Sequence, residues 1–198
     1  MMDELFKEME IYAAENHVPV ITLKAREVFR KVVREAGPKK VLEIGTAIGY
    51  STLVIASEAP ELEKITTLEL CEERAALAKG YIVRSPYKDK IEILTGDAGK
   101  LIEQLDDKYD LVFIDAAKGQ YPDYWHKIQP LLAQNVTVLA DNVLFRGYVF
   151  GDEPVPRRFR TIAKRLREYL LAVQNATGFS TEILSDGDGL AVSRRREI

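Results

Sequence analysis

Three oxygen-bearing side chains follow two strongly apolar segments, and they are the residues best suited to bind a metal ion. Asp115 comes directly after residues 111–114, and Asp141 and Asn142 come directly after residues 136–140. Carboxylates beside buried strands are costly unless they are paired or liganded. Two carboxylates and an amide carbonyl suit Mg²⁺, with Mn²⁺ or Ca²⁺ as substitutes. The alternative is that one Asp caps a helix and that Asp141 and Asn142 form a turn.

A second set of candidates surrounds the segment 40–51, KVLEIGTAIGYS. Gly45 and Gly49 bracket a turn between an apolar run and a helical pattern, and glycine lets a ligand approach the backbone closely. Glu69 ends the next predicted strand, 20 residues after Gly49, about where nucleotide-binding folds place a carboxylate for ribose hydroxyls. The G-x-G-x-x-G fingerprint is absent, which argues against NAD and for a cofactor that has a nucleoside but no phosphate. The alternative is an ordinary turn between a strand and a helix.

Alternating strands and helices would hold these residues at one edge of a sheet. Strands are predicted at 40–44, 64–70, 91–95, 109–115 and 136–141, and helices at 3–15, 22–36, 50–58, 72–84, 98–105, 122–130 and 157–175. This alternation predicts an α/β fold, with a mostly parallel sheet and helices on both faces. Runs at 181–184 and 190–193 flank a glycine turn and predict a terminal antiparallel hairpin.

Length and composition are typical of one soluble domain. The 198 residues are 46% apolar and 30% charged, so we expect a single domain over 1–198, with 1–37 as a helical cap or edge segment. We expect these first helices to cover the sheet edge or the cofactor and to contact a second subunit in a homodimer. No apolar run reaches membrane-spanning length, and the start lacks the apolar core of a signal peptide. A lone cysteine, Cys71, favours a cytoplasmic protein, and without a Cys/His cluster zinc is not expected.

Five strings in this order resemble a known family. They are LEIGTAIGYS, TLEL, TGDA, FIDAAKGQY and ADNVLF. Together they resemble the divalent-metal-dependent O-methyltransferases that use S-adenosylmethionine, which include catechol and caffeoyl-CoA enzymes. The resemblance covers about residues 14–196 and implies a Rossmann-like class I methyltransferase fold with a seven-stranded sheet.

The resemblance also implies roles for individual residues. It places Gly45, Ala47, Tyr50 and Ser51 along the methionine moiety, Glu69 on the ribose hydroxyls, and Asp97 and Ala98 beside the adenine. Glu43, Gly49 and Asp115 complete the predicted cofactor-binding set. Ser51 and Asp97 have an alternative as residues that cap or begin a helix. Lys118, three residues after Asp115, matches the family's general base; a nearby cation and partial burial would lower the pKa of such a lysine.

A narrower resemblance concerns the methyl acceptor. The strings AENHVP, DAAKGQY, DNVLFRG and GDGLAVS resemble bacterial tRNA hydroxyuridine methyltransferases, which convert wobble 5-hydroxyuridine to 5-methoxyuridine. The 5-hydroxyl and 4-carbonyl of that base form an adjacent oxygen pair that could chelate Mg²⁺. The resemblance thus predicts tRNA, through its anticodon loop, as the partner.

The basic last third of the chain could supply phosphate contacts. Residues 142–198 contain ten Lys and Arg against seven Asp and Glu, whereas the rest of the chain is acidic. We expect the arginines to gather at the mouth of the site: Arg146, Arg157, Arg158, Arg160, Arg194, Arg195 and Arg196. Aromatic side chains could stack on a splayed base, with core packing as the alternative: Tyr121, Tyr124, Trp125, Phe145 and Tyr148.

Three hypotheses follow from the sequence. The first is the tRNA methyltransferase. The second is a small-molecule catechol or acyl-CoA O-methyltransferase with the same core. The third is a cofactor-binding protein without catalysis, which the presence of the candidate ligands and Lys118 disfavours.

Overall fold

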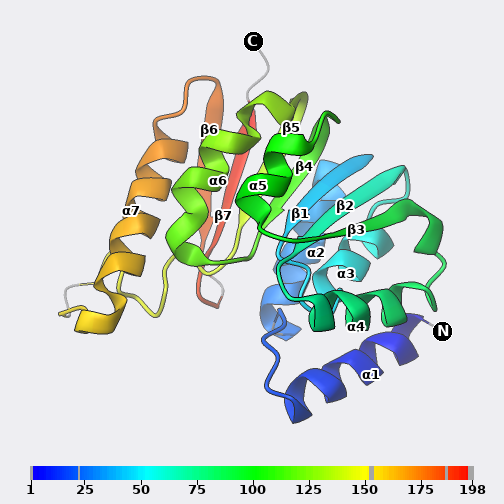
Figure 1. The fold of residues 1–198 in the computed structure, drawn as a ribbon. Coiled ribbons are helices and arrows are strands. Elements are labelled where there is room, and N and C mark those ends of the chain that lie inside the picture. The colour runs from blue at the N-terminus through cyan, green and yellow to red at the C-terminus, as the bar shows by residue number, and fades with distance from the viewer. Residues whose placement is uncertain (1, 22, 152–153, 186, 196–198) are drawn as a thin grey trace.

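A seven-stranded sheet with the strand order β3-β2-β1-β4-β5-β7-β6 forms the centre of the molecule (Figure 1). The computed structural model describes residues 2–21, 23–151, 154–185 and 187–195. β1 to β5 run parallel, while β7 is antiparallel to both β5 and β6. The predicted fold class is therefore confirmed, terminal hairpin included.

The strands and helices follow the predicted alternation closely. The strands are β1 (Lys40–Ile44), β2 (Lys64–Glu69), β3 (Ile91–Thr95), β4 (Tyr109–Ile114), β5 (Leu132–Ala140), β6 (Phe179–Leu184) and β7 (Leu190–Arg195). The α-helices are α1 (Met2–Glu15), α2 (Leu23–Ala36), α3 (Tyr50–Glu58), α4 (Glu72–Ile82), α5 (Ala98–Leu101), α6 (Tyr121–Ile128) and α7 (Arg160–Gln174). Short 3₁₀ turns are η1 (Lys88–Lys90), η2 (Ile102–Gln104), η3 (Lys118–Gln120), η4 (Gln129–Leu131) and η5 (Arg157–Phe159).

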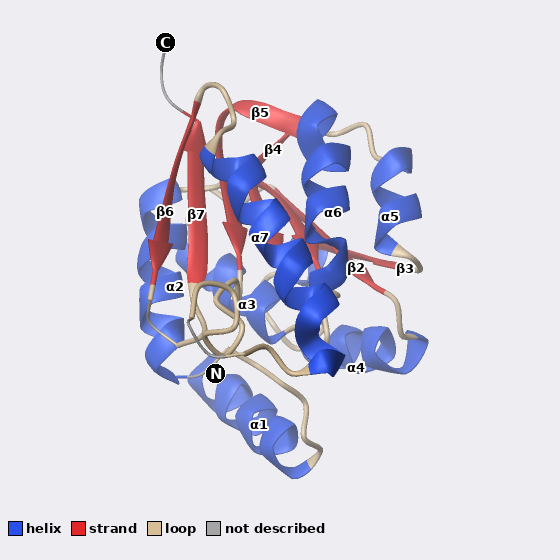
Figure 2. Cartoon of the chain, turned by 90° about the vertical axis from the view of Figure 1, so that its left-hand side faces the viewer, coloured by secondary structure: helices blue, strands red, loops and turns tan. Residues whose placement is uncertain are grey.

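Two hydrophobic cores lie on opposite faces of the sheet. One contains residues of α1 to α4, such as Phe29 and Leu53, and the other contains residues of α6 and α7, such as Trp125 and Leu166. In Figure 2, α7 and α6 cross in front of the sheet while α2 lies behind it. The central strands β1 and β4 are buried along almost their whole length because both of their faces are covered.

The differences from the predicted boundaries have local causes. β5 begins at Leu132 rather than at 136, and its first residues pair with β4 at Tyr109, before a shift of register. The predicted helix 98–105 is a single turn of α-helix followed by η2. Residues 157–159 form a 3₁₀ turn before α7. Such tightened turns at helix ends are common and leave no signal in apolar periodicity.

The N-terminal helices pack on the sheet rather than forming a separate body. Met9 of α1 and Phe29 of α2 belong to the same core as Val41 and Phe113 of the sheet. None of the helices in the described ranges is long and apolar enough to span a membrane. The homodimer and the assignment of 1–37 as a cap stay predictions.

Candidate active site

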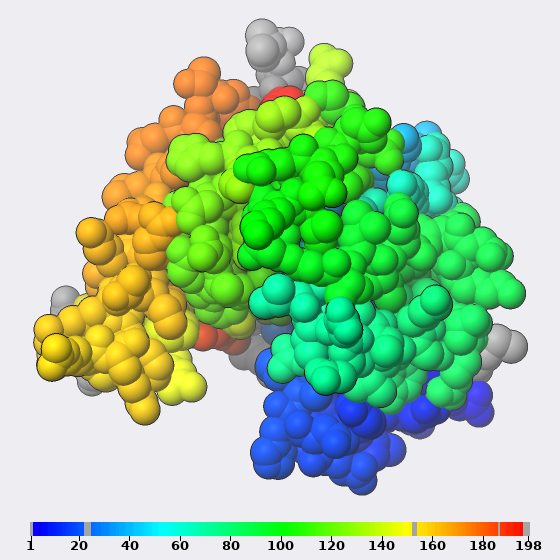
Figure 3. Space-filling view, viewed as in Figure 1, coloured from blue at the N-terminus to red at the C-terminus, as the bar shows by residue number. Residues whose placement is uncertain are grey.

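A cavity of about 650 Å³ opens at the edge of the sheet where the parallel strands end. Its walls come from the ends of β1, β2, β3, β4 and β5, from residues 19–21 between α1 and α2, and from the turn between β6 and β7. In Figure 3 the surface is hollowed between the gold segment that begins α7 and the blue and teal residues of α1 and α4. Crevices at this edge are where open α/β sheets bind ligands.

The turn from β1 to α3 forms the floor of the cavity. Gly45 has φ +105°, and a Cβ there would come within 2.1 Å of the Asp115 carbonyl oxygen. Only glycine therefore lets the ends of β1 and β4 lie against each other. Gly49 has φ +82° and would place a Cβ 3.3 Å from Ala78 of α4, so its role is to let α3 and α4 pack closely. Gly45, Ala47, Tyr50 and Ser51 line the cavity, whereas the lining does not include Gly49.

The Glu69 carboxylate is held in the cavity wall by backbone donors. Ala47 N donates to Oε2 at 2.8 Å and Cys71 N donates to Oε1 at 3.0 Å. The side chain is 7% exposed and lines the cavity. Each oxygen keeps a lone pair for a ligand, so Glu69 is oriented as an acceptor for hydroxyl groups.

Glu43 lies beneath the cavity floor instead of lining the cavity. It is fully buried and accepts hydrogen bonds from three hydroxyls: Ser51 at 2.5 Å, Thr67 at 2.6 Å, and Thr52. Burial raises the pKa of the Glu43 carboxyl to about 7, against the opposite influence of the three donors. In this position Glu43 organises the turn and does not contact a ligand directly.

The remaining predicted cofactor residues sit at the other strand ends. Asp97 and Ala98 line the cavity at the end of β3, and the Asp97 carboxylate caps α5 by accepting from Lys100 N at 3.0 Å. The capping alternative for Asp97 is thus confirmed, and a second role remains open to its other oxygen. Ser51 lies in the first turn of α3, where Gly49 rather than Ser51 is the N-cap.

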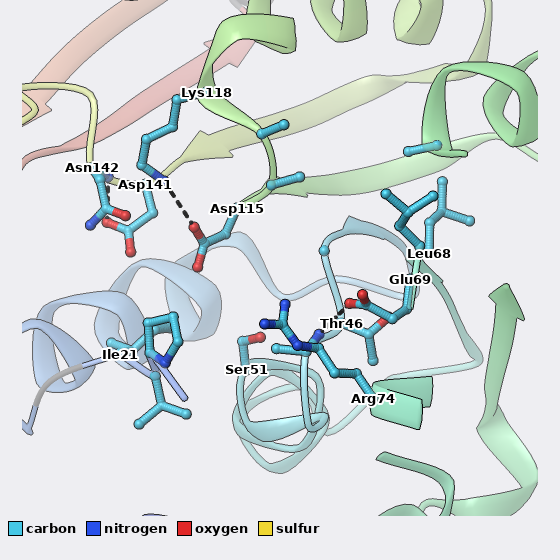
Figure 4. A pocket seen from close by; sticks show the side chains of 18 of the residues that line it. Ile21, Thr46, Ser51, Leu68, Glu69, Arg74, Asp115, Lys118, Asp141 and Asn142 are labelled. Carbon is cyan, nitrogen blue, oxygen red and sulfur yellow. Dashed lines mark hydrogen bonds and ion pairs between the residues drawn. The ribbon is translucent and has the colours of Figure 1, made fainter. Parts of the chain in front are cut away.

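The candidate metal ligands and Lys118 come together at the ends of β4 and β5. Figure 4 shows Asp115, Asp141 and Asn142 on one side of the cavity, with the Lys118 amine between them. Lys118 Nζ lies 3.4 Å from Asp115 Oδ1, and Asn142 N donates to Asp141 Oδ1 at 2.8 Å. Burial, and then the charge of Asp115, raise the pKa of the Asp141 carboxyl to about 6.

This donor set fits a divalent cation. Two carboxylates repel each other here, one of them largely buried, and Lys118 supplies a single positive charge. A bound cation would relieve that repulsion, and the oxygen donors match Mg²⁺ better than zinc. Among the described residues, no group of three or more His, Cys, Asp or Glu side chains is arranged to hold a metal ion, so the set of two carboxylates and one amide stays a prediction.

The buried Tyr121 and the half-buried Arg165 hold this arrangement in place. The Tyr121 hydroxyl lies within hydrogen-bond distance of the carbonyls of Ile114, at 3.2 Å, and Asp141, at 3.1 Å, so it ties the end of β4 to the end of β5. Arg165 of α7 donates from Nε to the Gly119 carbonyl at 2.9 Å, which anchors the turn that carries Lys118.

Most of the proposed stacking aromatics are buried. Tyr121 is completely buried and Trp125 packs edge-on against Tyr169 and Phe179, so core packing is confirmed for both. Tyr124 is 7% exposed but lines the cavity. Phe145 and Tyr148 are half-buried and pack around Phe159 near the cavity.

The prediction that all the arginines gather at the mouth is wrong for Arg194 and Arg195. β7 runs antiparallel to β5, so Ala191 pairs with Ala140 at the cavity edge while Arg194 pairs with Thr137, farther from the cavity. The end of β7 lies at the top of the sheet in Figure 1, opposite α1 and the start of α7. Arg194 forms ion pairs with Glu182 and Glu35, and Arg195 donates to the Ala133 carbonyl. Arg196 lies outside the described residues.

The other predicted arginines do lie at the cavity edge of the sheet, although none lines the cavity. Arg146 follows Asn142 closely, and its backbone N donates to the Asp188 carboxylate. The guanidinium carbons of Arg146 and Arg158 lie 5.5 Å and 4.5 Å from the centre of the Phe159 ring. Arg157 and Arg160, which precede and follow Arg158 and Phe159 in the chain, are exposed.

Several cavity residues carried no recognised signal in the sequence. Arg74 in the first turn of α4 faces the cavity, and Asp188 reaches it from the hairpin turn. Pro19, Val20 and Ile21 line it from the break between α1 and α2. Arg74 lies five residues after Glu69, near the start of the helix that follows β2. This position near a strand end was the one local sign in the sequence that Arg74 could reach the cavity. The place of Asp188 in the cavity lining could not be predicted without the tertiary fold.

Comparisons with known proteins show the family of the chain. Residues 2–196 match the model of a family described as O-methyltransferase. A Staphylococcus aureus crystal structure with the provisional name caffeoyl-CoA O-methyltransferase is 31% identical and superposes with a TM-score of 0.87, covering 96% of this chain and 91% of that one. Caffeoyl-CoA O-methyltransferase 2 of Populus trichocarpa is 28% identical over 97% of this chain and 82% of its own. An O-methyltransferase from Bacillus cereus shares the fold, with a TM-score of 0.85 at 23% identity over 98% of this chain and 91% of that one. The chain therefore belongs to the O-methyltransferase family.

Proposed function

We propose that this protein transfers the methyl group of S-adenosylmethionine to a hydroxyl, assisted by a divalent cation, and that the hydroxyl belongs to wobble 5-hydroxyuridine of tRNA. One observation carries the chemistry. A single cavity joins the oriented acceptor Glu69 at one end with Asp115, Asp141 and Lys118 at the other. A nucleoside cofactor and an ionisable hydroxyl would therefore meet inside it.

The cofactor assignment rests on the nucleoside end of the cavity. Glu69 accepts the two ribose hydroxyls with the lone pairs that Ala47 N and Cys71 N leave open. Leu70 and Ala98, which also line the cavity, offer apolar surface for the adenine. The structure of the Bacillus cereus O-methyltransferase was determined in complex with SAH, the demethylated form of this cofactor, which supports the assignment.

Asp115, Asp141 and Asn142 would hold the cation. When bound, it lowers the pKa of the acceptor hydroxyl and fixes two adjacent oxygens of the substrate. The bound cation would replace the Lys118 ammonium as the positive charge beside Asp115, so the lysine releases its proton and its neutral amine accepts the proton of the hydroxyl. The new O–CH₃ bond forms as the S–CH₃ bond breaks, and the bonding electron pair stays on the sulfur. The walls of the cavity contribute mainly orientation, because the sulfonium methyl is already activated.

The surface beside the cavity supports the tRNA acceptor. Arg146 and Arg158 flank Phe159, and Phe145 and Tyr148 pack around the same ring. Exposed guanidinium groups next to aromatic rings suit a polyanion with splayed bases. The arginines lie at the edge where the anticodon loop would enter.

A small phenolic substrate is the second candidate. The Populus trichocarpa relative is named for caffeoyl-CoA, whose ring carries two adjacent hydroxyls, and the same carboxylates and Lys118 would serve such a substrate. Family membership favours both enzymatic hypotheses over a binding protein without catalysis.

The test compares acceptors directly. Purified protein with labelled S-adenosylmethionine and Mg²⁺ should methylate tRNA that carries 5-hydroxyuridine, and mass spectrometry of the digested nucleosides should show 5-methoxyuridine. tRNA with unmodified uridine at the wobble position is the matched control. If the protein methylates caffeoyl-CoA or a free catechol but does not methylate tRNA, the small phenolic substrate replaces tRNA as the proposed acceptor.

EDTA tests the cation separately. Calorimetry in EDTA should still show cofactor binding, because Glu69 and Asp97 lie apart from Asp115, Asp141 and Asn142. Turnover should disappear in EDTA and return with Mg²⁺. Full activity in EDTA would contradict the metal-assisted reaction but not the methyl transfer.

A further inference from the structure

Arg74 is a cation in the cavity wall to which the reaction described above gives no role. It lies in the first turn of α4, is exposed, and points into the cavity on the side of Ser51 and Thr46 (Figure 4). Lys118, the other cation of the described lining, is paired with Asp115. Within the described part of the chain, Arg74 has no hydrogen-bond or ion-pair partner.

The cavity wall beside Arg74 presents side-chain acceptors rather than side-chain donors. The Ser51 and Thr67 hydroxyls both donate to Glu43, so the Thr46 hydroxyl donates in turn to Thr67 at 2.6 Å. Backbone donors of the turn are also engaged, because Gly45 N and Thr46 N donate to the Leu68 carbonyl. The oxygens of Ser51 and Thr46 keep lone pairs, which suit an ammonium group but not a carboxylate.

The cavity is also rich in negative charge. Its described lining contains five carboxylates: Glu69, Asp97, Asp115, Asp141 and Asp188. A ligand that carries a carboxylate of its own needs a positive group to enter such a site. The first amides of α3 offer partial charge, since no side chain caps that helix at Gly49. Since Lys118 is paired with Asp115, Arg74 is the full positive charge of the described lining that remains for a ligand carboxylate.

We infer that Arg74 binds the carboxylate of the methionine tail of the cofactor and makes the cavity selective for a cofactor with that group. This inference rests on the proposed function, because it takes S-adenosylmethionine as the ligand. The tail then lies with its ammonium toward the hydroxyl oxygens of Ser51 and Thr46 and its carboxylate between Arg74 and the start of α3. The guanidinium fork suits two parallel hydrogen bonds to a carboxylate.

Two ligands that differ only in the carboxylate test this role. S-Adenosylhomocysteine and its decarboxylated analogue are titrated by calorimetry into wild type, Arg74→Met and Arg74→Lys. Lys79→Met is the matched control, because it removes a charge from an exposed position of α4 outside the cavity lining. Arg74→Met should lose about tenfold or more in affinity for S-adenosylhomocysteine, as expected when a charge-assisted hydrogen bond is removed. Its affinity for the decarboxylated analogue should match that of wild type. The affinity of Arg74→Lys for S-adenosylhomocysteine should fall between those of wild type and Arg74→Met.

Equal losses for both ligands would show that Arg74 contacts the nucleoside or shapes the wall, and would overturn the inference. Unchanged affinity for S-adenosylhomocysteine in Arg74→Met would overturn it as well. Binding of neither ligand to wild type would reject the cofactor assignment itself, a result distinct from any effect of the variant.

Discussion

Lys118 is the residue on which the proposed chemistry most depends. Its amine lies 3.4 Å from the Asp115 carboxylate and 5.6 Å from the centre of the Tyr121 ring, with an 18% exposed side chain. Lys118→Ala should lower kcat by roughly 10²–10⁴, the usual contribution of a general base. Cofactor affinity by calorimetry should not change, and raising the pH should restore part of the rate because hydroxide can then remove the proton.

Lys100→Ala is the control for Lys118, since Lys100 is exposed and its side chain lies outside the described cavity lining. A Lys118→Ala enzyme that turns over as fast as the control would assign Lys118 a structural role only.

Glu43 makes stability depend on pH. Its pKa is raised to about 7 in the folded protein, against 4.5 for an ordinary glutamate, so the folded state holds a proton over a range in which the unfolded chain has released it. Stability from this group is therefore complete below pH 4.5 and is lost as the pH rises through 7. The full shift corresponds to about 3 kcal/mol.

Glu43→Gln removes this titration while it keeps the shape of the side chain. Urea unfolding of both proteins in EDTA, at pH 5 and pH 8, should show wild type losing about 2–3 kcal/mol relative to the variant as the pH rises. Comparing the two proteins cancels the titration of other groups. A difference in stability that stays constant between the two pH values would contradict the assignment.

At the scale of elements, the turn between β1 and α3 brings two parts of the site together. Gly45 allows the end of β1 to touch the backbone at Asp115, so the same contact forms the cavity floor and places a candidate metal ligand. Gly45→Ala should destabilise the fold by about 3 kcal/mol, because the Cβ meets a backbone carbonyl and φ is +105°. Any folded fraction should lose activity.

Gly80→Ala is the matched comparison within α4. Nothing lies within 4 Å of a Cβ at Gly80, and alanine is the better helix former, so this variant should gain about 0.5–1 kcal/mol. Thermal unfolding of both variants measures the two effects. Equal effects of the two substitutions would show that the close contact at Gly45 is unimportant.

At the scale of the whole molecule, the arginines are divided between opposite edges of the sheet. Arg157 and Arg158 lie at the cavity edge, and Arg194 and Arg195 lie at the end of β7 away from it. If tRNA is the acceptor, Arg157→Ala with Arg158→Ala should weaken tRNA binding and lower its salt slope by roughly one unit for each phosphate that an arginine no longer neutralises. Cofactor affinity should stay the same.

Arg194→Ala with Arg195→Ala removes the same charge from the far edge and serves as the control. Filter binding over a range of salt concentrations should give this control the slope of wild type. If both pairs lower the slope equally, tRNA binds by a general charge effect and does not enter along the 157–160 segment.

Local sequence was enough to predict most of the fold. Apolar strands such as β1 and β4 are covered on both faces, so their residues alone indicate buried parallel strands. The ends of β2, β4 and β5 then place Glu69, Asp115 and Asp141 at one edge, because parallel strands end on the same side. The positions of these three residues at the cavity edge could therefore be predicted from the sequence alone.

Only the tertiary structure decided the roles of Glu43, Tyr121, Arg74 and Arg194. Glu43 and Tyr121 are polar residues beside functional positions in the sequence, but packing buries both and turns them into supports for the cavity. Arg74 faces the cavity because α4 begins beside the end of β2. Arg194 lies away from it because β7 pairs antiparallel with β5, and the direction of a pairing between distant segments depends on the whole sheet rather than on neighbouring residues.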